Sequence, residues 1–252
     1  MAPIRLVLLD VDGCLIAGEA KPWNFGVMEF IAQLNRRARE DPSQFAVTLC
    51  TGRQEPYVEA IMQAIDGHLP AIYENGGGLY FPAPYRFAVN PTFTPQMHES
   101  LVEIRHRLGR ELVQRGLAQI QPGKEVSVTL YPARADIGFP QLAELASRAL
   151  DGMLNGFSIH VSLTTVEILP PGIDKGAGAE WLAQETGIAL ADMAGIGDAP
   201  ADLAYLRKCG ASATTANAPD AVKRAVQYVS PYPDSLGTQD ILQRWMNRTA
   251  AR

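Results

Sequence analysis

The sequence has 252 residues, of which 47% are hydrophobic and 19% are charged, and its formal net charge is −5. A chain of this composition can bury a substantial core, which excludes a disordered protein. The negative balance, without a long run of Lys or Arg, argues against a nucleic-acid-binding surface. The three cysteines form no CxxC pair. This argues against a disulfide framework or a zinc site and favours a reducing compartment.

The apolar run at the N-terminus is broken by Asp10 and is too short for a signal peptide. No apolar stretch approaches the roughly 20 residues that a helix needs to span a bilayer. We therefore expect a cytoplasmic protein that has no membrane partner.

Short apolar runs alternate with helical patterns over the first third of the chain. We expect strands and helices in turn at residues 4–9, 25–40, 45–50, 57–65 and 71–73. This alternation is typical of a parallel sheet with helices on both faces.

The pattern changes after Pro82, where two prolines suggest a crossing between domains. A helix is expected at 95–115, then strands at 117–121 and 125–131, a helix at 140–154, and strands at 157–163 and 165–169. From residue 170 the first pattern resumes, with elements at 174–186, 193–197, 199–208, 212–215 and 220–228. The predicted fold is α/β, with a doubly wound, Rossmann-like parallel sheet formed by residues 1–82 and 170–252. An α+β domain of residues 83–169 is inserted into it.

Polar clusters stand where predicted strands end or helices begin. They are Asp10-Val11-Asp12-Gly13, Thr51-Gly52-Arg53, Asp174-Lys175, and Gly197-Asp198 with Asp202. Ligands of open parallel sheets bind beyond the carboxyl ends of the strands. We therefore expect the four clusters to meet in one pocket.

The side chains of these clusters are complementary in chemistry. Asp10 and Asp198 are suited to hold a hard cation such as Mg²⁺, which reverses the local charge for a phosphate. Asp10 has an oxygen free to attack phosphorus, and Asp12, two residues on, can act as general acid and base. Lys175 and Thr51 can bind the phosphate oxygens.

Each cluster also has an ordinary interpretation when taken alone. Asp10, Asp12 and Asp198 are common helix-capping or turn residues, and Asp202 a common first-turn acid. Arg53 suits a structural salt bridge as well as a substrate contact. The glycines at 76–78 favour a flexible turn at a domain hinge. The agreement of four clusters in order favours a single catalytic site.

With these four motifs in this order, the sequence resembles the haloacid dehalogenase superfamily of phosphatases. The spacing is similar to the capped, Cof-like subgroup (type IIB), including phosphoglycolate and sugar-phosphate phosphatases. Glu74-Asn75-Gly76-Gly77, Val166-Glu167-Ile168 and Asn217-Ala218 also look like that subgroup. Three positions depart from the family pattern, because Cys14, Ala199 and Ala201 stand where Thr, Ser and Asn are common.

The resemblance implies a role for each matching residue. Asp10 would be the nucleophile and Asp12 the acid and base, and Asp10, Asp12, Asp198 and Asp202 would form the metal site. Thr51, Gly52 and Lys175 would bind phosphate, Arg53 and Asn75 would bind substrate, and the inserted domain would be a cap. The expected activity is Mg²⁺-dependent hydrolysis of a small phosphorylated metabolite through an aspartyl-phosphate. Two alternatives remain at this point: a phosphotransferase or mutase of the same superfamily, and a non-catalytic phosphometabolite-binding protein.

Overall fold

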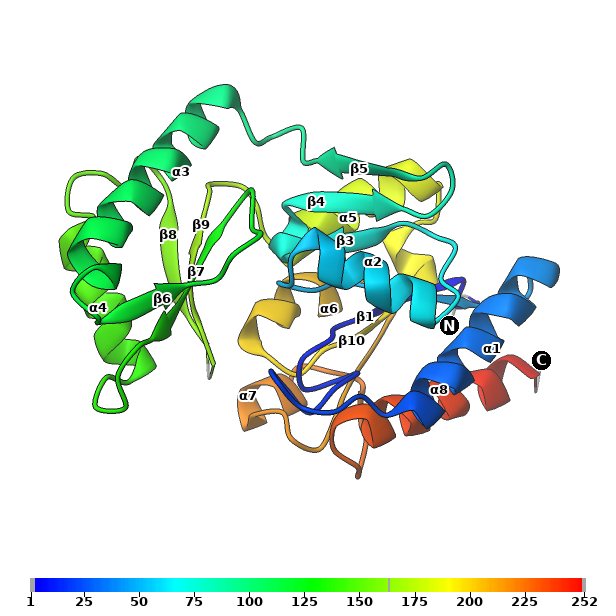
Figure 1. The fold of residues 1–252 in the computed structure, drawn as a ribbon. Coiled ribbons are helices and arrows are strands. Elements are labelled where there is room, and N and C mark those ends of the chain that lie inside the picture. Colours follow the sequence, from blue (N-terminus) through cyan, green and yellow to red (C-terminus); the bar gives the residue numbers. More distant parts are fainter. Residues whose placement is uncertain (1–2, 163, 251–252) are drawn as a thin grey trace. The chain divides into compact units, whose positions relative to one another are not determined.

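The computed structural model describes residues 3–162 and 164–250. The chain forms two compact units (Figure 1), one of Met1–Ala88 with Asp174–Arg252 and the other of Val89–Ile173. The first unit thus includes residues 83–88, which the sequence placed in the inserted domain. The second unit includes residues 170–173, which the sequence placed with the parallel sheet. Within the described ranges, no helix combines the length and the apolar character needed to cross a membrane.

The first unit is built on a five-stranded parallel sheet with the strand order β12-β11-β10-β1-β2. Its strands are β1 (Leu6–Leu9), β2 (Ala46–Leu49), β10 (Met193–Ile196), β11 (Ala211–Thr214) and β12 (Tyr228–Val229). The order steps outward from β1 in both directions, which is the arrangement of a doubly wound sheet. This confirms the expected fold class.

Alternating side chains of β1 enter two different hydrophobic clusters. Val7 and Leu9 pack with α1 (Phe25–Glu40), α2 (Glu55–Ala64) and α8 (Asp234–Ala250). Leu6 and Leu8 pack in the other cluster, whose helices are α5 (Lys175–Thr186), α6 (Leu203–Leu206) and α7 (Asp220–Lys223). Because both faces of the strand are buried, every residue of β1 is apolar. Helices therefore cover both faces of the sheet.

A small second sheet follows in the order β3 (Ala71–Tyr73), β4 (Gly78–Phe81) and β5 (Arg86–Val89). Pro82 and Pro84, the prolines that suggested a domain crossing, lie within the turn between β4 and β5. The glycine run is not a flexible turn, because residues 74–81 are all buried. Glu74, Asn75 and Gly76 form a left-handed turn with φ of +46°, +56° and +96°, and Gly78 begins β4.

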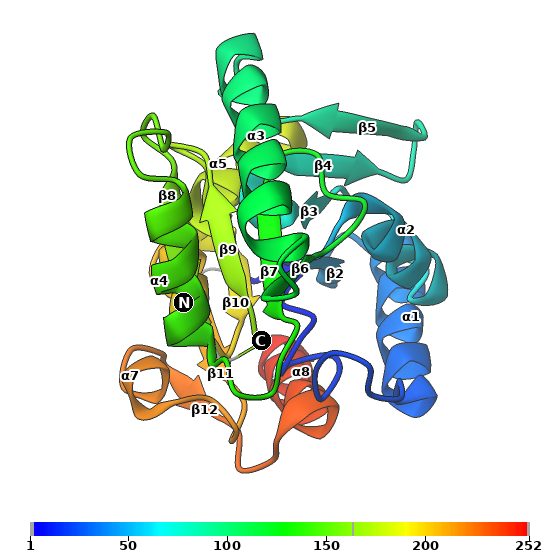
Figure 2. The ribbon, with the colours of Figure 1, turned by 60° about the vertical axis from the view of Figure 1, so that its left-hand side comes forward.

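The second unit carries its own hydrophobic core beneath a four-stranded sheet of order β6-β7-β9-β8. Its elements are α3 (Pro95–Leu108), β6 (Ala118–Ile120), β7 (Val128–Pro132), α4 (Phe139–Ala149), β8 (Ser158–Val161) and β9 (Val166–Leu169). Figure 2 shows α3 and α4 side by side on one face of this sheet. The element order is the expected one, and Leu163, the last residue of one expected strand, lies outside the described residues.

Several expected helices are shorter in the structure. The pattern at 95–115 gives α3 and then a π-helical turn at Gly109–Val113. The pattern at 199–208 gives a 3₁₀ turn at Pro200–Asp202 before α6. The helix expected at 220–228 ends at Lys223, because Tyr228 and Val229 pair with β11 as an edge strand.

Candidate functional site

The polar clusters of the first unit begin at the same level of the sheet. Leu9 of β1 is in register with Leu49 of β2 and with Ile196 of β10. Residues directly beyond these three strand ends include Asp10, Thr51 and Asp198. Parallel pairing therefore carries side chains from distant parts of the sequence to one edge, as the sequence predicted.

Three carboxylates and one ammonium group form a compact cluster at this edge. Ligand oxygens of Asp10, Asp198 and Asp202 lie within 4.8 Å of one another. Lys175 Nζ lies 2.9 Å from Asp10 Oδ1 and 2.6 Å from Asp202 Oδ1. Asp10, Lys175 and Asp202 are each at most 5% exposed. The cluster joins the residue after β1, the first residue of α5 and the segment after β10, and Lys175 contacts Asp10 and Asp202 directly.

The electrostatics of the cluster show an excess of negative charge. Burial raises the pKa of the Asp10 carboxyl well above its ordinary value, and the charge of Asp202 raises it further. Burial likewise raises the pKa of Asp198 to about 7, with a further contribution from Asp202. Burial alone would lower the pKa of Lys175, but Asp10 and Asp202 together raise it. One ammonium therefore does not compensate three carboxylates.

Asp202 is the fully buried anchor of Lys175. Its Oδ1 accepts from Lys175, and its Oδ2 accepts from the Ala199 backbone N–H at 2.8 Å. Both carboxylate oxygens are thus engaged, so Asp202 is placed to hold Lys175 and the loop that carries Asp198. Asp174 caps α5 by accepting from Ala177 N at 2.7 Å, which fixes Lys175 at the first helical position.

Asp12 and Arg53 form a bidentate ion pair. Arg53 Nε donates to Asp12 Oδ2 at 2.7 Å, and Arg53 Nη2 donates to Asp12 Oδ1 at 2.6 Å. Glu19 lies 3.8 Å from the same guanidinium, and the ring of Tyr57 lies 4.9 Å beneath it. The sequence left both a structural salt bridge and a substrate contact open for Arg53. The structure shows the salt bridge, and the partner is Asp12, the residue expected to act as general acid and base.

The left-handed turn at 74–76 holds the segment that carries Thr51. Asn75 N donates to Thr51 O and Glu74 N donates to Arg53 O, both at 2.9 Å. Asn75 is 3% exposed, and its positive φ suits Asn better than most residues. Thr51 is buried beside the chain of β3, while Gly52 is half-buried in the same loop. The turn therefore fixes the backbone of the expected phosphate-binding loop.

Gly13 allows the segment that carries Asp10 to lie close to the side chain of Asp198. Its φ is +77°, and a Cβ added there would overlap the carboxylate of Asp198. Only glycine satisfies both the left-handed backbone and this close contact. The glycine of the first motif thus sets how near Asp198 can come to the chain that carries Asp10.

We expect Gly13→Ala to lower the free energy of unfolding by about 2–4 kcal/mol, because it adds an overlap to the cost of a left-handed alanine. Gly116→Ala is the matched control, since φ there is +66° and no atom lies within 4 Å of an added Cβ. That control should cost about 1–2 kcal/mol. Urea denaturation of both variants measures the difference, and equal losses would show that Asp198 does not press on Gly13.

Two hydroxyl groups that sequence reasoning did not single out hold the same loop. Thr215 Oγ1 donates to Gly13 O at 3.1 Å, and Thr238 Oγ1 donates to Cys14 O at 2.9 Å. Thr238 lies on α8, a helix absent from the sequence-based prediction. No local motif marks either residue, because their function depends on contacts more than 200 positions away along the chain.

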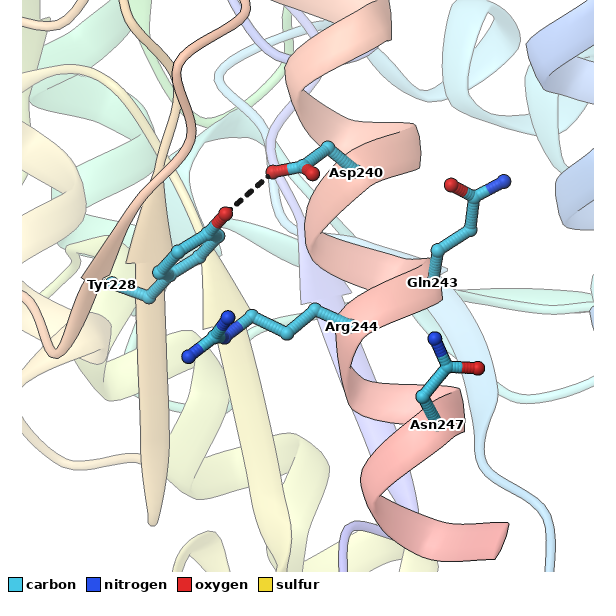
Figure 3. Close-up of a pocket in the computed structure, with 5 residues that line it drawn as sticks. All are labelled: Tyr228, Asp240, Gln243, Arg244 and Asn247. Atoms are coloured by element: carbon cyan, nitrogen blue, oxygen red, sulfur yellow. Dashed lines mark hydrogen bonds between the residues drawn. The ribbon is translucent and has the colours of Figure 1, made fainter.

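A separate surface hollow lies between β12 and α8 (Figure 3) and is lined by Tyr228, Asp240, Gln243, Arg244 and Asn247. Tyr228 OH donates to Asp240 at 2.8 Å, and the Arg244 guanidinium lies 4.4 Å from the Tyr228 ring centroid. None of the expected site residues lines this hollow.

Comparison with known proteins agrees with this architecture. Residues 141–242 match the family model of haloacid dehalogenase-like hydrolases. A phosphoglycolate phosphatase of Methanopyrus kandleri is 25% identical over 98% of this chain and 99% of its own length. Another from Methanospirillum hungatei is 24% identical over 99% and 100%.

Solved structures show the same fold over nearly the whole chain. A Thermoplasma acidophilum protein superposes with a TM-score of 0.72 at 20% identity, covering 96% of this chain and 98% of its own. The sucrose-phosphatase of Synechocystis, solved with sucrose and phosphate, gives a TM-score of 0.68 at 13% identity, covering 97% and 98%.

Proposed function

We propose that the chain is a Mg²⁺-dependent phosphomonoesterase that uses Asp10 as its nucleophile. Its similarity to the haloacid dehalogenase-like hydrolases over residues 141–242, and to phosphoglycolate phosphatases over nearly the whole chain, supports this proposal. The observation that carries the proposal is the buried contact of 2.9 Å between Asp10 Oδ1 and Lys175 Nζ, beside the carboxylates of Asp198 and Asp202. A carboxylate held against a fixed cation at the end of a parallel sheet is suited to attack a phosphate ester.

The residues at this edge fit a divalent cation. When all three carboxylates are ionised, as a bound cation would favour, the one ammonium leaves two negative charges uncompensated, and all the candidate ligand atoms are hard oxygens. Asp10 and Asp198 would hold Mg²⁺ together with the backbone carbonyl of Asp12, while Asp202 supports them by fixing Lys175 and the 199 backbone. When bound, Mg²⁺ supplies the positive charge that allows a phosphate dianion to approach the carboxylates.

The proposed reaction has two steps on this chain's own residues. An Asp10 oxygen attacks phosphorus, and the bond from phosphorus to the ester oxygen breaks as Asp12 donates a proton to the leaving alcohol. Asp12 then takes a proton from water, whose oxygen attacks phosphorus, so that inorganic phosphate leaves and the Asp10 carboxylate is restored. Thr51, Gly52 and Lys175 bind the phosphate oxygens in both steps.

Arg53 has a defined part in this scheme. Its two hydrogen bonds hold both oxygens of Asp12 in one plane. We assign Arg53 to orienting the Asp12 carboxylate. Before Asp12 donates a proton, the proposed reaction requires one of these two hydrogen bonds to open, so that one Asp12 oxygen can carry the proton. We retain the expected substrate contact for the remaining N–H groups of Arg53 and for Asn75.

The second unit is proposed as the cap that selects the substrate. Relatives and neighbours of the chain include a phosphoglycolate phosphatase and a sucrose-phosphatase. This supports a small phosphorylated metabolite, either phosphoglycolate or a sugar phosphate, as the substrate class.

Phosphate release from a panel of small esters tests the proposal, with 2-phosphoglycolate and several sugar phosphates each measured in Mg²⁺ and in excess EDTA. We expect release in Mg²⁺ and a loss of at least about 100-fold in chelator, restored by added Mg²⁺. Release that persists in chelator would remove the metal from the mechanism. Tight binding of an ester without any release would support a binding protein instead.

A further inference from the structure

The side chain of Asn217 joins three segments of the first unit. Its Nδ2 donates to Gly13 O at 3.0 Å and to Asp198 Oδ2 at 3.1 Å. Its Oδ1 accepts from the backbone N–H of Asp234, at the start of α8, at 2.8 Å. One amide thus connects the loop after β1, the loop after β10 and the helix α8.

We infer that Asn217 is a positioning residue for the cation site, acting through Asp198, an inference that rests on the proposed function. A primary amide has two N–H donors, and Asn217 directs one to Gly13 and one to Asp198. With both donors committed, the side chain is suited to hold Asp198 rather than to bind substrate.

Within the described part of the chain, few other side chains near Asp198 can donate a hydrogen bond to its carboxylate. Ala199 and Ala201 have no polar side chain with which to orient the carboxylate. Among the side chains that the structure describes, Cys14 also reaches Asp198, but its Sγ lies 3.8 Å from Oδ1 and a thiol is a weak donor. Among the described side chains, Asn217 is therefore the strong donor that orients Oδ2.

The amide also sets the distance between two parts of the site. Gly13 O accepts from Asn217 and from Thr215 Oγ1, which ties the segment carrying Asp10 to the end of β11. Asp198 is bound by the same Asn217 nitrogen. Partners that orient a metal-binding carboxylate typically change metal affinity 10–100-fold when they are removed.

The test compares Asn217→Ala and Asn217→Gln with Asn247→Ala, the same truncation at an exposed amide on α8. Calorimetric titration with MgCl₂ in the absence of substrate gives the Mg²⁺ dissociation constant. Phosphate release across Mg²⁺ concentrations gives kcat and KM. We expect a 10–100-fold weaker Mg²⁺ affinity for Asn217→Ala, a smaller loss for Asn217→Gln, and the parent value for Asn247→Ala.

The substrate KM at saturating Mg²⁺ should stay within about threefold of the parent, because Asn217 acts on the cation site alone. A purely structural role would lower the melting temperature without weakening Mg²⁺ binding, and that result would overturn the inference. Failure of the parent itself to bind Mg²⁺ or release phosphate would overturn the proposed function, so the two failures are distinguishable.

Discussion

Replacement of Asp10 by Asn is expected to reduce phosphate release by on the order of 10⁴-fold or more, because the amide has no nucleophilic oxygen of comparable strength. The fold should survive the change. Lys175 keeps its contact with Asp202 at 2.6 Å, and the variant removes a buried charge that Asp202 and Asp198 both disfavour. The melting temperature in chelator should therefore equal or exceed that of the parent.

Single-turnover phosphate release and thermal unfolding are the two measurements for Asp10→Asn. Asp220→Asn is the matched control, since Asp220 is an exposed carboxylate in the first turn of α7, and both of its values should match the parent. Loss of activity accompanied by a large drop in melting temperature would attribute the effect to misfolding. Retained activity would exclude Asp10 as the nucleophile.

Sequence patterns predicted well the elements whose burial follows a simple rule, such as a strand buried on both faces or a helix buried along one face. β1 is apolar at every position because both of its faces are buried, and α1 begins and ends at the expected residues because one face packs on the sheet. The motif residues could be placed together from the sequence because parallel strands in register carry them to one edge. A strand followed by a polar motif is a pattern of adjacent residues, and such a pattern can be recognised from the sequence alone.

The parts that escaped prediction depend on contacts between distant segments. β5 is mostly exposed and its apolar run is only three residues long, so it is recognised as a strand by its pairing with β4. The left-handed turn at 74–76 forms where Gly76 packs against the backbone of Asp174. In α8, the buried apolar residues that the structure describes include Ile241, Leu242 and Trp245, which form a short stripe. Glycine content or amphipathic spacing alone does not encode these contacts.

The same holds for the site: the sequence identified its residues, but it did not show which of them contact one another. Sequence motifs identified Asp10, Lys175 and Asp202, but only the structure shows that Lys175 lies between the two carboxylates. Arg53 was placed at the site by its motif, yet its bidentate contact with Asp12 follows from the path of the β2–α2 loop.

The buried position of Lys175 predicts a second large effect, on stability. We expect Lys175→Met to lower the free energy of unfolding by about 3–5 kcal/mol, because the change leaves Asp10 and Asp202 buried without their cation. Lys208→Met is the control: its ion pair with Glu180 has the same kind of geometry, at 2.7 Å, but is exposed. An exposed pair contributes at most about 1 kcal/mol. Urea denaturation in EDTA, which keeps divalent cations from replacing the ammonium, measures both.

The pH dependence of this loss separates unpaired charge from simple loss of packing. Burial already raises the pKa of Asp10 above its ordinary value of 3.8 with Lys175 present, and removal of the ammonium raises it further. A carboxyl with a raised pKa holds a proton in the folded state that the unfolded state has released, so stability falls as the pH rises above about 4. The deficit of Lys175→Met should therefore be larger at pH 7 than at pH 4.

Asp202→Asn introduced into the Lys175→Met background gives the decisive comparison. The amide oxygen of Asn can still accept from the Ala199 N–H that Asp202 Oδ2 now binds at 2.8 Å, while one uncompensated charge is removed. The double variant should thus be more stable than Lys175→Met alone, with a weaker dependence on pH. The single Asp202→Asn variant completes the cycle. If its loss of stability and that of Lys175→Met simply added in the double variant, the ammonium would not be compensating Asp202. The observed contact of 2.6 Å would then contribute nothing to the stability of the site.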